Sequence, residues 1–517
     1  MNTRPFSLAA AGLALALAVP GLATAQDDAP VLRALTTFGI PELNPVGAAS
    51  NYLYDFGASE TLMRVLDDGV ARPWILESLE SVDELTWVLT LRQGITFQNG
   101  KTVDARAVMD VIEYMLEHSG TAQNAMPEGS SFEITGDYEL TLRTAEPFPA
   151  VTAALAGDQT FPIFDVEAVR AVEGDWPRLV DAGHLTGPYR LVEHVGEEGF
   201  TLERNPDYWQ GTPALAGVSV RIVADTNARI LAVQNGEVDI AFYPPSSARA
   251  VVEQTPGIHF VETPSFGGVL AVMDTSEPPF DDLRVRQALM LAIDYDQIAE
   301  EVFGSPERRA TGLFPPAVDW SVGTQDTDIE AARALLAEAG WEAGNDGLLV
   351  RDGARFAITG LIYPQQPDLV PLTAAIQYQL HQIGIDLQIL SVEDIDSVMM
   401  EHDPEWDLGF YSTSSLQWGV PDQFLQRFVR TGGDRNFGAY SNAEVDDLID
   451  ALVVTVDTDQ RAEILTRIQE ILLSEDPYLS TTIFSVGRAV VSEDWQDYRQ
   501  GPFNAFVTWE TAPDSLL

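Results

Sequence analysis

The hydrophobic pattern in the first part of the chain switches between the period of a strand and that of a helix. Residues 87–92, Trp-Val-Leu-Thr-Leu-Arg, alternate as a half-buried strand does. Asp104 is placed to cap a helix that runs to Leu116, because apolar residues recur there every three or four positions. Residues 131–143 are predicted to form a hairpin about the turn Gly136-Asp137. This part of the chain therefore mixes strands and helices.

Strand and helix patterns continue to alternate to the end of the chain. The expected strands are residues 31–36, 218–223, 238–241, 258–271, 356–362, 386–390, 408–411 and 479–491. The expected helices are residues 58–66, 225–235, 285–302, 330–339, 372–383, 442–453 and 459–473. This alternation favours βαβ units and a mixed, partly parallel sheet, an α/β fold. No repeat or low-complexity linker is evident, which favours a hinged pair of lobes with chain crossings between them.

One stretch has the composition of a binding site mounted on a strand. Residues 408–411 are apolar, and a loop of small polar residues follows them up to Asp422. This loop carries one large aromatic residue, Trp418, framed by Gly419 and Pro421. Loops held on a rigid strand commonly present binding residues. The alternative is that Trp418 packs in a core or anchors the loop.

Length and composition restrict the class of protein. The chain has 517 residues, which suggests about three domains or lobes. Hydrophobic residues make up 45% of it, enough for large cores. Cysteine is absent, which removes disulfides, thiolate metal sites, a thiol nucleophile and a lipid-modified cysteine.

The first residues have the pattern of an export signal. An apolar run from Leu8 to Val19 follows Arg4, and Ala23-Thr24-Ala25 is a small-x-small cleavage pattern. We expect cleavage near Ala25 and a soluble periplasmic protein that is not a lipoprotein; an uncleaved signal anchor is the alternative. No later stretch reaches the roughly 18 apolar residues of a membrane span.

The chain is strongly acidic, with a formal net charge of −50. Lys101 is its only lysine, and acidic residues are spread over the whole length. This charge repels nucleic acid and anionic membranes, so neither is an expected partner. Adaptation to a salty medium explains it most simply; a calcium-binding surface is a weaker alternative because no Asp-x-Asp-x-Asp-Gly loop occurs.

Catalytic constellations are missing from the sequence. There is no Gly-x-Ser-x-Gly elbow, phosphate-binding loop or His-Glu-x-x-His motif, and the six histidines are scattered. Paired carboxylates are expected by chance in so acidic a chain. We therefore expect no enzyme activity and no cofactor or metal, and a ligand site between two lobes. A secreted hydrolase or an adhesive protein is a remote alternative.

An ordered set of stretches carries a family resemblance. They are residues 87–100 with Asp104-Ala105, 187–189, 204–209, 235–239, 285–294 and 334–341. In this order they resemble the extracytoplasmic solute-binding proteins, family 5, of peptide and nickel ABC importers. The resemblance implies a two-lobe periplasmic-binding-protein fold of type II, in the large cluster with an extra subdomain, joined by a two-strand hinge.

The resemblance also implies the division of the chain. Residues 1–25 are the signal peptide; lobe I covers 26–268, with a side subdomain at about 60–185; lobe II covers 269–484; and 485–517 return to lobe I. The crossings are expected near 264–271 and 484–491. Arg92, Asn205 and Asp294 are implied to be framework residues.

The implied function is capture of a solute, with delivery to the transmembrane subunits of an ABC permease, by a monomer without a membrane anchor. We expect the ligand-binding cleft to be lined by the following residues, some of which are alternatively packing residues: Tyr52, Tyr54, Phe266, Gly267, Trp418 and Asp422, with Asn436 and Tyr440 on a second loop.

The cargo is predicted to be a short peptide, with a nickel chelate as the alternative. In the dipeptide binders an aspartate takes the peptide ammonium; Gln417 stands nearest to that position here, with Asp422 close by. Trp418 to Pro421 match the Trp-Gly-x-Pro of the nickel-chelate binders. The arginine that those proteins place on the chelator is absent from residues 156–163, and Leu53 replaces their methionine.

Overall fold

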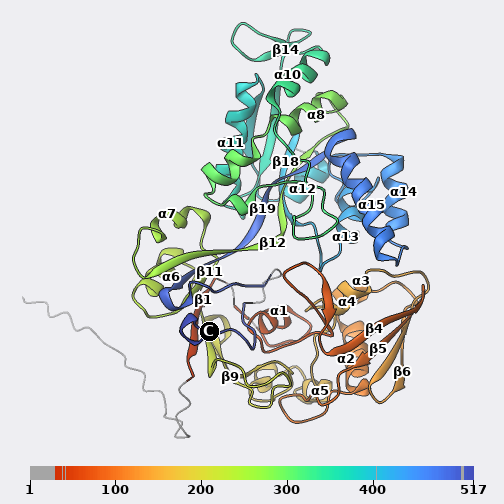
Figure 1. Cartoon of the computed structure of the whole chain (residues 1–517), viewed down its shortest axis with the longest axis vertical. Coiled ribbons are helices and arrows are strands. Elements are labelled where there is room, and N and C mark those ends of the chain that lie inside the picture. Colours follow the sequence, from red (N-terminus) through yellow and green to blue (C-terminus); the bar gives the residue numbers. More distant parts are fainter. Residues whose placement is uncertain (1–28, 38, 41, 403–404, 502–505) are drawn as a thin grey trace, which may run out of the picture.

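One mixed sheet runs through both lobes of the computed structural model (Figure 1). The structure describes residues 29–37, 39–40, 42–402, 405–501 and 506–517, and among these the sheet has ten strands. Their order is β17-β16-β18-β12-β19-β11-β1-β10-β9-β8. The bounds are β1 Val31–Thr36, β8 Tyr189–His194, β9 Gly199–Arg204, β10 Gly217–Ile222, β11 Ile240–Phe242, β12 Ile258–Met273, β16 Ala357–Ile362, β17 Asp386–Ser391, β18 Leu408–Ser414 and β19 Leu479–Ser492.

Parallel and antiparallel pairs occur in the same sheet, as the alternating pattern predicted. Strand β1 is parallel to β10 and β11, whereas β9 is antiparallel to β10. In the other lobe β16 is parallel to β17 and β18. Helix α6 (Thr226–Gln234) connects β10 to β11, and Asp225 caps it by accepting from the Ala228 amide. The predicted α/β class is confirmed.

Two long strands cross between the lobes. β12 and β19 pair antiparallel from Ile258 opposite Ser492 to Val272 opposite Leu479. Their register shifts between Pro264 and Gly268, where the ladder is interrupted. Figure 1 shows both strands passing from the lower lobe, lobe I, to the upper lobe, lobe II. The domain boundaries placed at 268 and 484 remain a prediction.

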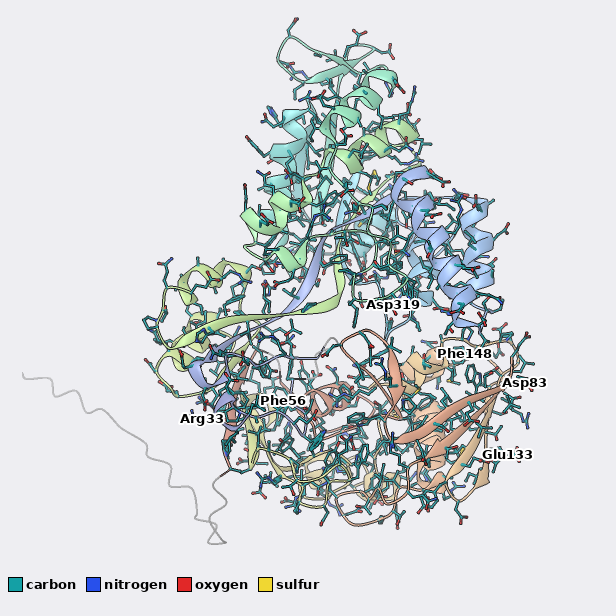
Figure 2. All side chains as sticks on the ribbon, viewed as in Figure 1. Arg33, Phe56, Asp83, Glu133, Phe148 and Asp319 are labelled. Atoms are coloured by element: carbon teal, nitrogen blue, oxygen red, sulfur yellow. The ribbon has the colours of Figure 1, made fainter. Side chains whose placement is uncertain are left out.

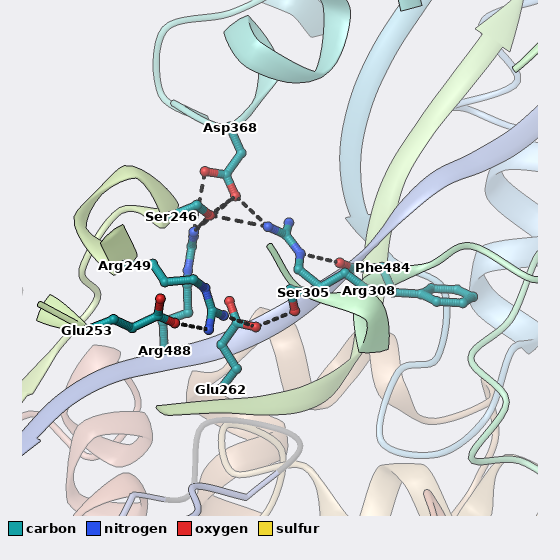
Figure 3. Close-up of polar contacts among 9 residues, drawn as sticks. All are labelled: Ser246, Arg249, Glu253, Glu262, Ser305, Arg308, Asp368, Phe484 and Arg488. Carbon is teal, nitrogen blue, oxygen red and sulfur yellow. Dashed lines mark hydrogen bonds and ion pairs between the residues drawn. The ribbon is translucent and has the colours of Figure 1, made fainter. Parts of the chain in front are cut away.

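A polar network lies beside these crossing strands (Figure 3). The Asp368 carboxylate of lobe II accepts from Arg308 at 3.2 Å and from Arg488 of β19 at 3.0 Å. Ser246, which follows β11, also donates to Asp368, at 3.0 Å. A second group joins Glu262 of β12 to Arg249, at 2.5 Å, and to the hydroxyl of Ser305. Acidic and basic side chains from both lobes therefore form ion pairs with one another near the crossing strands.

Lobe I also contains a second, smaller sheet, within the residues for which the family resemblance implies a side subdomain. A four-stranded sheet, β4-β5-β7-β6, packs there with helix α2, and Figure 2 places the side chains of Asp83 and Glu133 on it. Asp104 caps α2, accepting from the Ala107 amide at 2.9 Å. The predicted strand, helix and hairpin are all confirmed. The bounds are β4 Leu76–Asp83, β5 Thr86–Leu91, α2 Ala105–His118, β6 Ser131–Gly136 and β7 Glu139–Arg143.

The helix predicted over 58–66 is wrong. A helix, α1 (Ala48–Asp55), comes earlier, and Met63–Val65 form strand β2, paired with β3 (Ala71–Pro73). The Glu60 side chain explains the change, because it is buried and accepts from the Trp74 indole at 2.8 Å and the Tyr208 hydroxyl at 2.7 Å. These long-range bonds override the local helix propensity.

Helices surround the lobe II part of the sheet. They include α8 Leu283–Ala292, α10 Ile329–Glu338, α11 Leu369–Gln382, α14 Ala443–Leu452 and α15 Thr458–Glu470. The single helix predicted over 285–302 is divided: α8 ends at Ala292, and Asp294 caps a new helix, α9 (Tyr295–Gln297), followed by η4 (Ile298–Val302). The other predicted helices here agree within a few residues.

Shorter elements complete the structure. They include α3 Gly120–Ala125, α4 Val151–Ala156, α5 Val166–Ala171, α7 Arg249–Val252, α12 Ile395–Glu401, α13 Asp422–Phe424, β13 Glu342–Ala343, β14 Leu349–Arg351 and β15 Ala354–Arg355. Within the described ranges, no helix combines the length and the apolar character that a membrane crossing requires. The predicted signal peptide, 1–25, lies outside the described residues.

Candidate functional site

Helix α1 presents two tyrosines of the predicted site from lobe I. Tyr52 is half-buried, and Tyr54 is buried. Burial raises the pKa of Tyr54 to about 12, so this hydroxyl stays neutral and acts as a hydrogen-bonding group. Tyr52 also has a raised pKa, through burial and the nearby charge of Asp55.

A tight turn presents Trp418 from lobe II. The amide of Gln417 donates to the Val420 carbonyl at 2.9 Å, and the reverse bond measures 3.1 Å. The two central residues have positive φ, 50° for Trp418 and 90° for Gly419. A tryptophan rarely adopts this conformation, and such local strain is concentrated at functional sites. The turn therefore holds the Trp418 side chain in one direction at a cost in local stability.

Trp418 and its turn touch lobe I. The rings of Trp418 and Tyr54 are perpendicular, with centroids 6.4 Å apart. A Cβ on Gly157 would lie 3.5 Å from the Trp418 indole nitrogen, so Gly157 lies close to the edge of the ring that carries this nitrogen. A Cβ on Gly419 would lie 2.3 Å from the carbonyl oxygen of Gly69. The structure thus brings together Tyr54 and Trp418, two of the residues that the sequence predicted for the site.

Strand β12 supports this turn at the crossing. The Phe266 carbonyl accepts from the amides of Ser415 and Leu416, at 3.1 and 3.3 Å. Gly267 pairs with Ser414, and a Cβ there would lie 2.9 Å from the Thr413 carbonyl oxygen. The Phe266 ring is buried, 2.9 Å from the position of a Cβ on Gly69. Phe266 and Gly267 therefore fix the loop against lobe I.

Asp422 lies in a different environment from the aromatic pair. Its carboxylate is buried and accepts from Arg461 of α15 at 2.6 Å. An ion pair inside lobe II already neutralises this charge, so Asp422 is poorly suited to take a second cation.

Asn436 and Tyr440 form a second loop that is held by its own contacts. The Asn436 amide group donates to the carbonyls of Arg430 and Tyr440, and its oxygen accepts from the Tyr440 amide. The Tyr440 ring stacks on Tyr478 with centroids 4.4 Å apart. These contacts hold Asn436 and Tyr440 within lobe II, and none of them reaches Tyr54 or Trp418.

The sequence predictions missed polar residues beside the aromatic contact. The Asn51 amide donates to the Asp158 carboxylate at 2.6 Å, and Asp158 follows Gly157, which lies close to the Trp418 indole nitrogen. Asp55 and Asp158 are 1% and 2% exposed. Asn51 and Asp55 are four residues apart and share a helix face, a spacing that becomes a signal only once α1 is known. Nothing in the local pattern marks Asp158.

A second cluster lies behind Tyr54 within lobe I. A cavity of about 20 Å³ is lined by Tyr54, Glu60 and Arg64 among others. The Arg64 guanidinium lies 4.8 Å from the centroid of the Trp74 ring. This space fits about one water molecule and not a solute. In the part of the chain that the structure describes, no group of three or more His, Asp or Glu residues is arranged to hold a metal ion.

Comparison with known proteins identifies the class. Residues 70–436 match the bacterial extracellular solute-binding proteins, family 5, in their middle region. The nickel-binding protein NikA of Staphylococcus aureus is 26% identical over 410 residues, 79% of each chain. The oligopeptide-binding protein AppA of Bacillus subtilis is 25% identical over 456 residues, 83% of this chain and 81% of AppA.

A solved structure agrees with this result. The nickel ABC transporter protein of Bacillus halodurans superposes with a TM-score of 0.81 and 26% identity, over 93% of this chain and 99% of that one. The fold is that of the two-lobe periplasmic binding proteins. The chain belongs to the family 5 extracellular solute-binding proteins, and its relatives include peptide-binding and nickel-binding proteins of ABC importers.

Proposed function

We propose that this protein captures a small solute between its lobes and delivers it to the transmembrane subunits of an ABC importer. The contact of Tyr54 with Trp418 carries the proposal, because it joins an aromatic residue of each lobe at one point. Separation of the lobes about β12 and β19 would expose both rings to solute. The role is binding and not catalysis, as in the relatives named above.

The proposed cargo is a short peptide or a similar amine-bearing solute. The relation to AppA supports this class. The site itself supplies buried carboxylates on lobe I and no arginine in residues 156–163. Carboxylates attract an ammonium group and repel a chelator that is rich in carboxylates.

A nickel complex is the second candidate. The run from Trp418 to Pro421 resembles the nickel-chelate binders, and the relation to NikA supports it. An indole packs well on a flat organic ligand, so the aromatic pair is compatible with either cargo.

We further propose that the protein is exported to the periplasm, that its signal peptide is cleaved near Ala25, and that it works as a monomer without a lipid anchor. The proposed lobes are 26–268 with 485–517, and 269–484. The apolar run from Leu8 to Val19 and the absence of cysteine support this localisation.

Ligand-dependent thermal stabilisation in high salt tests the function. A cargo present at a hundredfold excess over its Kd adds about 2.7 kcal/mol to the free energy of unfolding. We expect a mixture of di- to pentapeptides to raise the melting temperature more than the nickel–histidine complex. A shift with nickel–histidine alone would favour the second candidate, and no shift with either would contradict the proposal.

A further inference from the structure

Two carboxylates on lobe I are buried near one another, and the residue before one of them, Gly157, lies close to the Trp418 indole nitrogen. Asp55 ends α1 and Asp158 follows α4, and they are 1% and 2% exposed. Asn51 lies on the same face of α1 as Asp55 and donates to Asp158 at 2.6 Å. Asn51 therefore links Asp158 to the face of α1 that carries Asp55.

No cation compensates this pair in the described part of the chain. Asp158 receives the Asn51 amide and backbone amides, and Oδ1 of Asp55 is buried without a hydrogen-bond partner. Burial raises the pKa of Asp158 to about 6, and burial together with Asp158 raises that of Asp55 well above its usual value. Two other buried carboxylates are paired with arginine: Asp368 with Arg308 and Arg488, and Asp422 with Arg461.

Tyrosine side chains lie near Asp55, and Tyr54 lies near both acids. Four tyrosines have their pKa raised by burial and, to a smaller extent, by the charge of Asp55: Tyr52, Tyr54, Tyr243 and Tyr498. The Trp418 indole nitrogen lies close to Gly157, the neighbour of Asp158. Carboxylates beside aromatic faces attract an organic cation through charge and through the ring quadrupoles.

We propose that Asp55 and Asp158 together bind a primary ammonium group of the cargo, and that Trp418 of lobe II closes over it. This inference rests on the proposed function and narrows it to cargo that carries an amine. Opening of the lobes would move Trp418 away from Gly157 and give solute access to the pair from the Asp158 side. An entering ammonium would supply the missing positive charge, and closure would then exclude water from the ion pair.

Binding of paired probes tests the proposal. Wild type, Asp158→Asn and Asp55→Asn are titrated calorimetrically with a mixture of Ala-Xaa-Ala tripeptides, the same mixture N-acetylated, putrescine, and nickel–histidine. Exposed Asp175→Asn serves as the control, because its carboxylate makes no cap bond in lobe I. Comparison of the free tripeptides with putrescine shows whether the site prefers a peptide amino terminus or a simple diamine.

The expected result is that a free amine binds wild type and the control, and that acetylation or Asp158→Asn weakens binding about thirtyfold or more. Both Asn variants should fold, with melting temperatures without cargo equal to or above that of wild type, because each removes a buried uncompensated charge. Either variant suffices if the other does not fold.

Two other outcomes overturn the proposal. If acetylated tripeptides or nickel–histidine bind wild type and Asp158→Asn equally well, the acid pair is not the recognition element, although the proposed function stands. If no probe binds wild type, both the proposed function and this inference fail.

Discussion

The indole of Trp418 meets the phenol of Tyr54 edge to face across the two lobes, with ring planes at 90° and centroids 6.4 Å apart. Trp418 reaches this position from a turn in which it has a φ of 50°. The turn belongs to lobe II and α1 belongs to lobe I, so this contact forms only when the lobes are closed. The turn is also strained, as residues at functional sites often are.

Replacing Trp418 by alanine should weaken cargo binding while leaving the fold intact. An aromatic pair contributes about 0.5–1.5 kcal/mol beyond its buried area, so affinity should fall about tenfold. The free energy of unfolding without cargo should change by less than about 1 kcal/mol, because the half-buried ring lies at the lobe contact. Calorimetric titration and urea unfolding measure the two effects.

Trp176→Ala is the control for that experiment. Trp176 is also half-buried, but it lies on the short helix η1 (Trp176–Leu179), within the residues proposed for the side subdomain. Its removal should leave cargo affinity unchanged. Equal losses of affinity in the two variants would show that Trp418 has no special role.

Gly419→Ala should hinder closure. A Cβ at this position would lie 2.3 Å from the Gly69 carbonyl oxygen of the other lobe. Gly432 is a matched control, since its φ is also positive, 77°, and its Cβ would meet nothing within 4 Å. Both variants should lose about 1 kcal/mol of stability from the backbone conformation. Only Gly419→Ala should also lose cargo affinity, and comparable affinities would rule out the steric argument.

The pH dependence of stability should reveal Asp158. Its pKa is about 6 in the folded protein and 3.8 ordinarily. The folded state therefore holds the proton more tightly, and this group makes stability fall as pH rises from about 4 to 6, by about 3 kcal/mol. His184 has the opposite effect on stability. Burial lowers its pKa to about 4, so the folded state disfavours the protonated ring, and the stability that neutral His184 contributes is lost as pH falls below 6.5.

Comparing Asp158→Asn with wild type in urea unfolding measures the effect of Asp158 together with the change that it causes in the pKa of Asp55. The variant should match wild type near pH 4 and be more stable by about 3 kcal/mol at pH 7. His184 is common to both proteins and cancels in the difference. A stability difference that does not vary with pH would mean that Asp158 ionises normally.

In the polar network beside the crossing strands, Asp368→Asn should lower the free energy of unfolding strongly. Arg308 is buried, with 4% of its side chain exposed, and loses its carboxylate in this variant. Leaving a buried charge unpaired costs about 3–5 kcal/mol. Asp450→Asn is the comparison, because the Asp450–Arg430 pair is exposed and should contribute less than about 1 kcal/mol. Similar melting temperatures for the two variants would show that the network adds little.

Added salt should raise the melting temperature. With a net charge of −50, repulsion destabilises the compact state at low ionic strength. The screening length shortens from about 10 Å at 0.1 M to about 3 Å at 1 M. Scanning calorimetry over this range should show a steep rise, and a flat response would refute adaptation to a saline medium.

Local pattern predicted the elements that local interactions determine. The cap at Asp104, the helix after Asp225 and the hairpin at Gly136-Asp137 follow from neighbouring residues. Elements that depend on distant contacts were not predicted correctly. Residues 58–66 form no helix because Glu60 is held by Trp74 and Tyr208.

The candidate site divides in the same way. Trp418 was recognisable from its Gly and Pro neighbours, whereas Asp158 is defined by Asn51, which is 107 residues away in the sequence. Asp422 was predicted as a site residue from its place in the loop, but its partner Arg461 lies 39 residues further along the chain. Pairing across the fold, which no sequence window contains, decides which carboxylate is compensated.

Backbone amide hydrogen exchange, with and without the tripeptide mixture, tests most directly whether solute binds between the lobes. Binding should slow exchange together in residues 48–55 of lobe I and residues 414–422 of lobe II. Slower exchange confined to one lobe, or to the groove lined by Trp320, Thr466 and Arg467, would contradict the account.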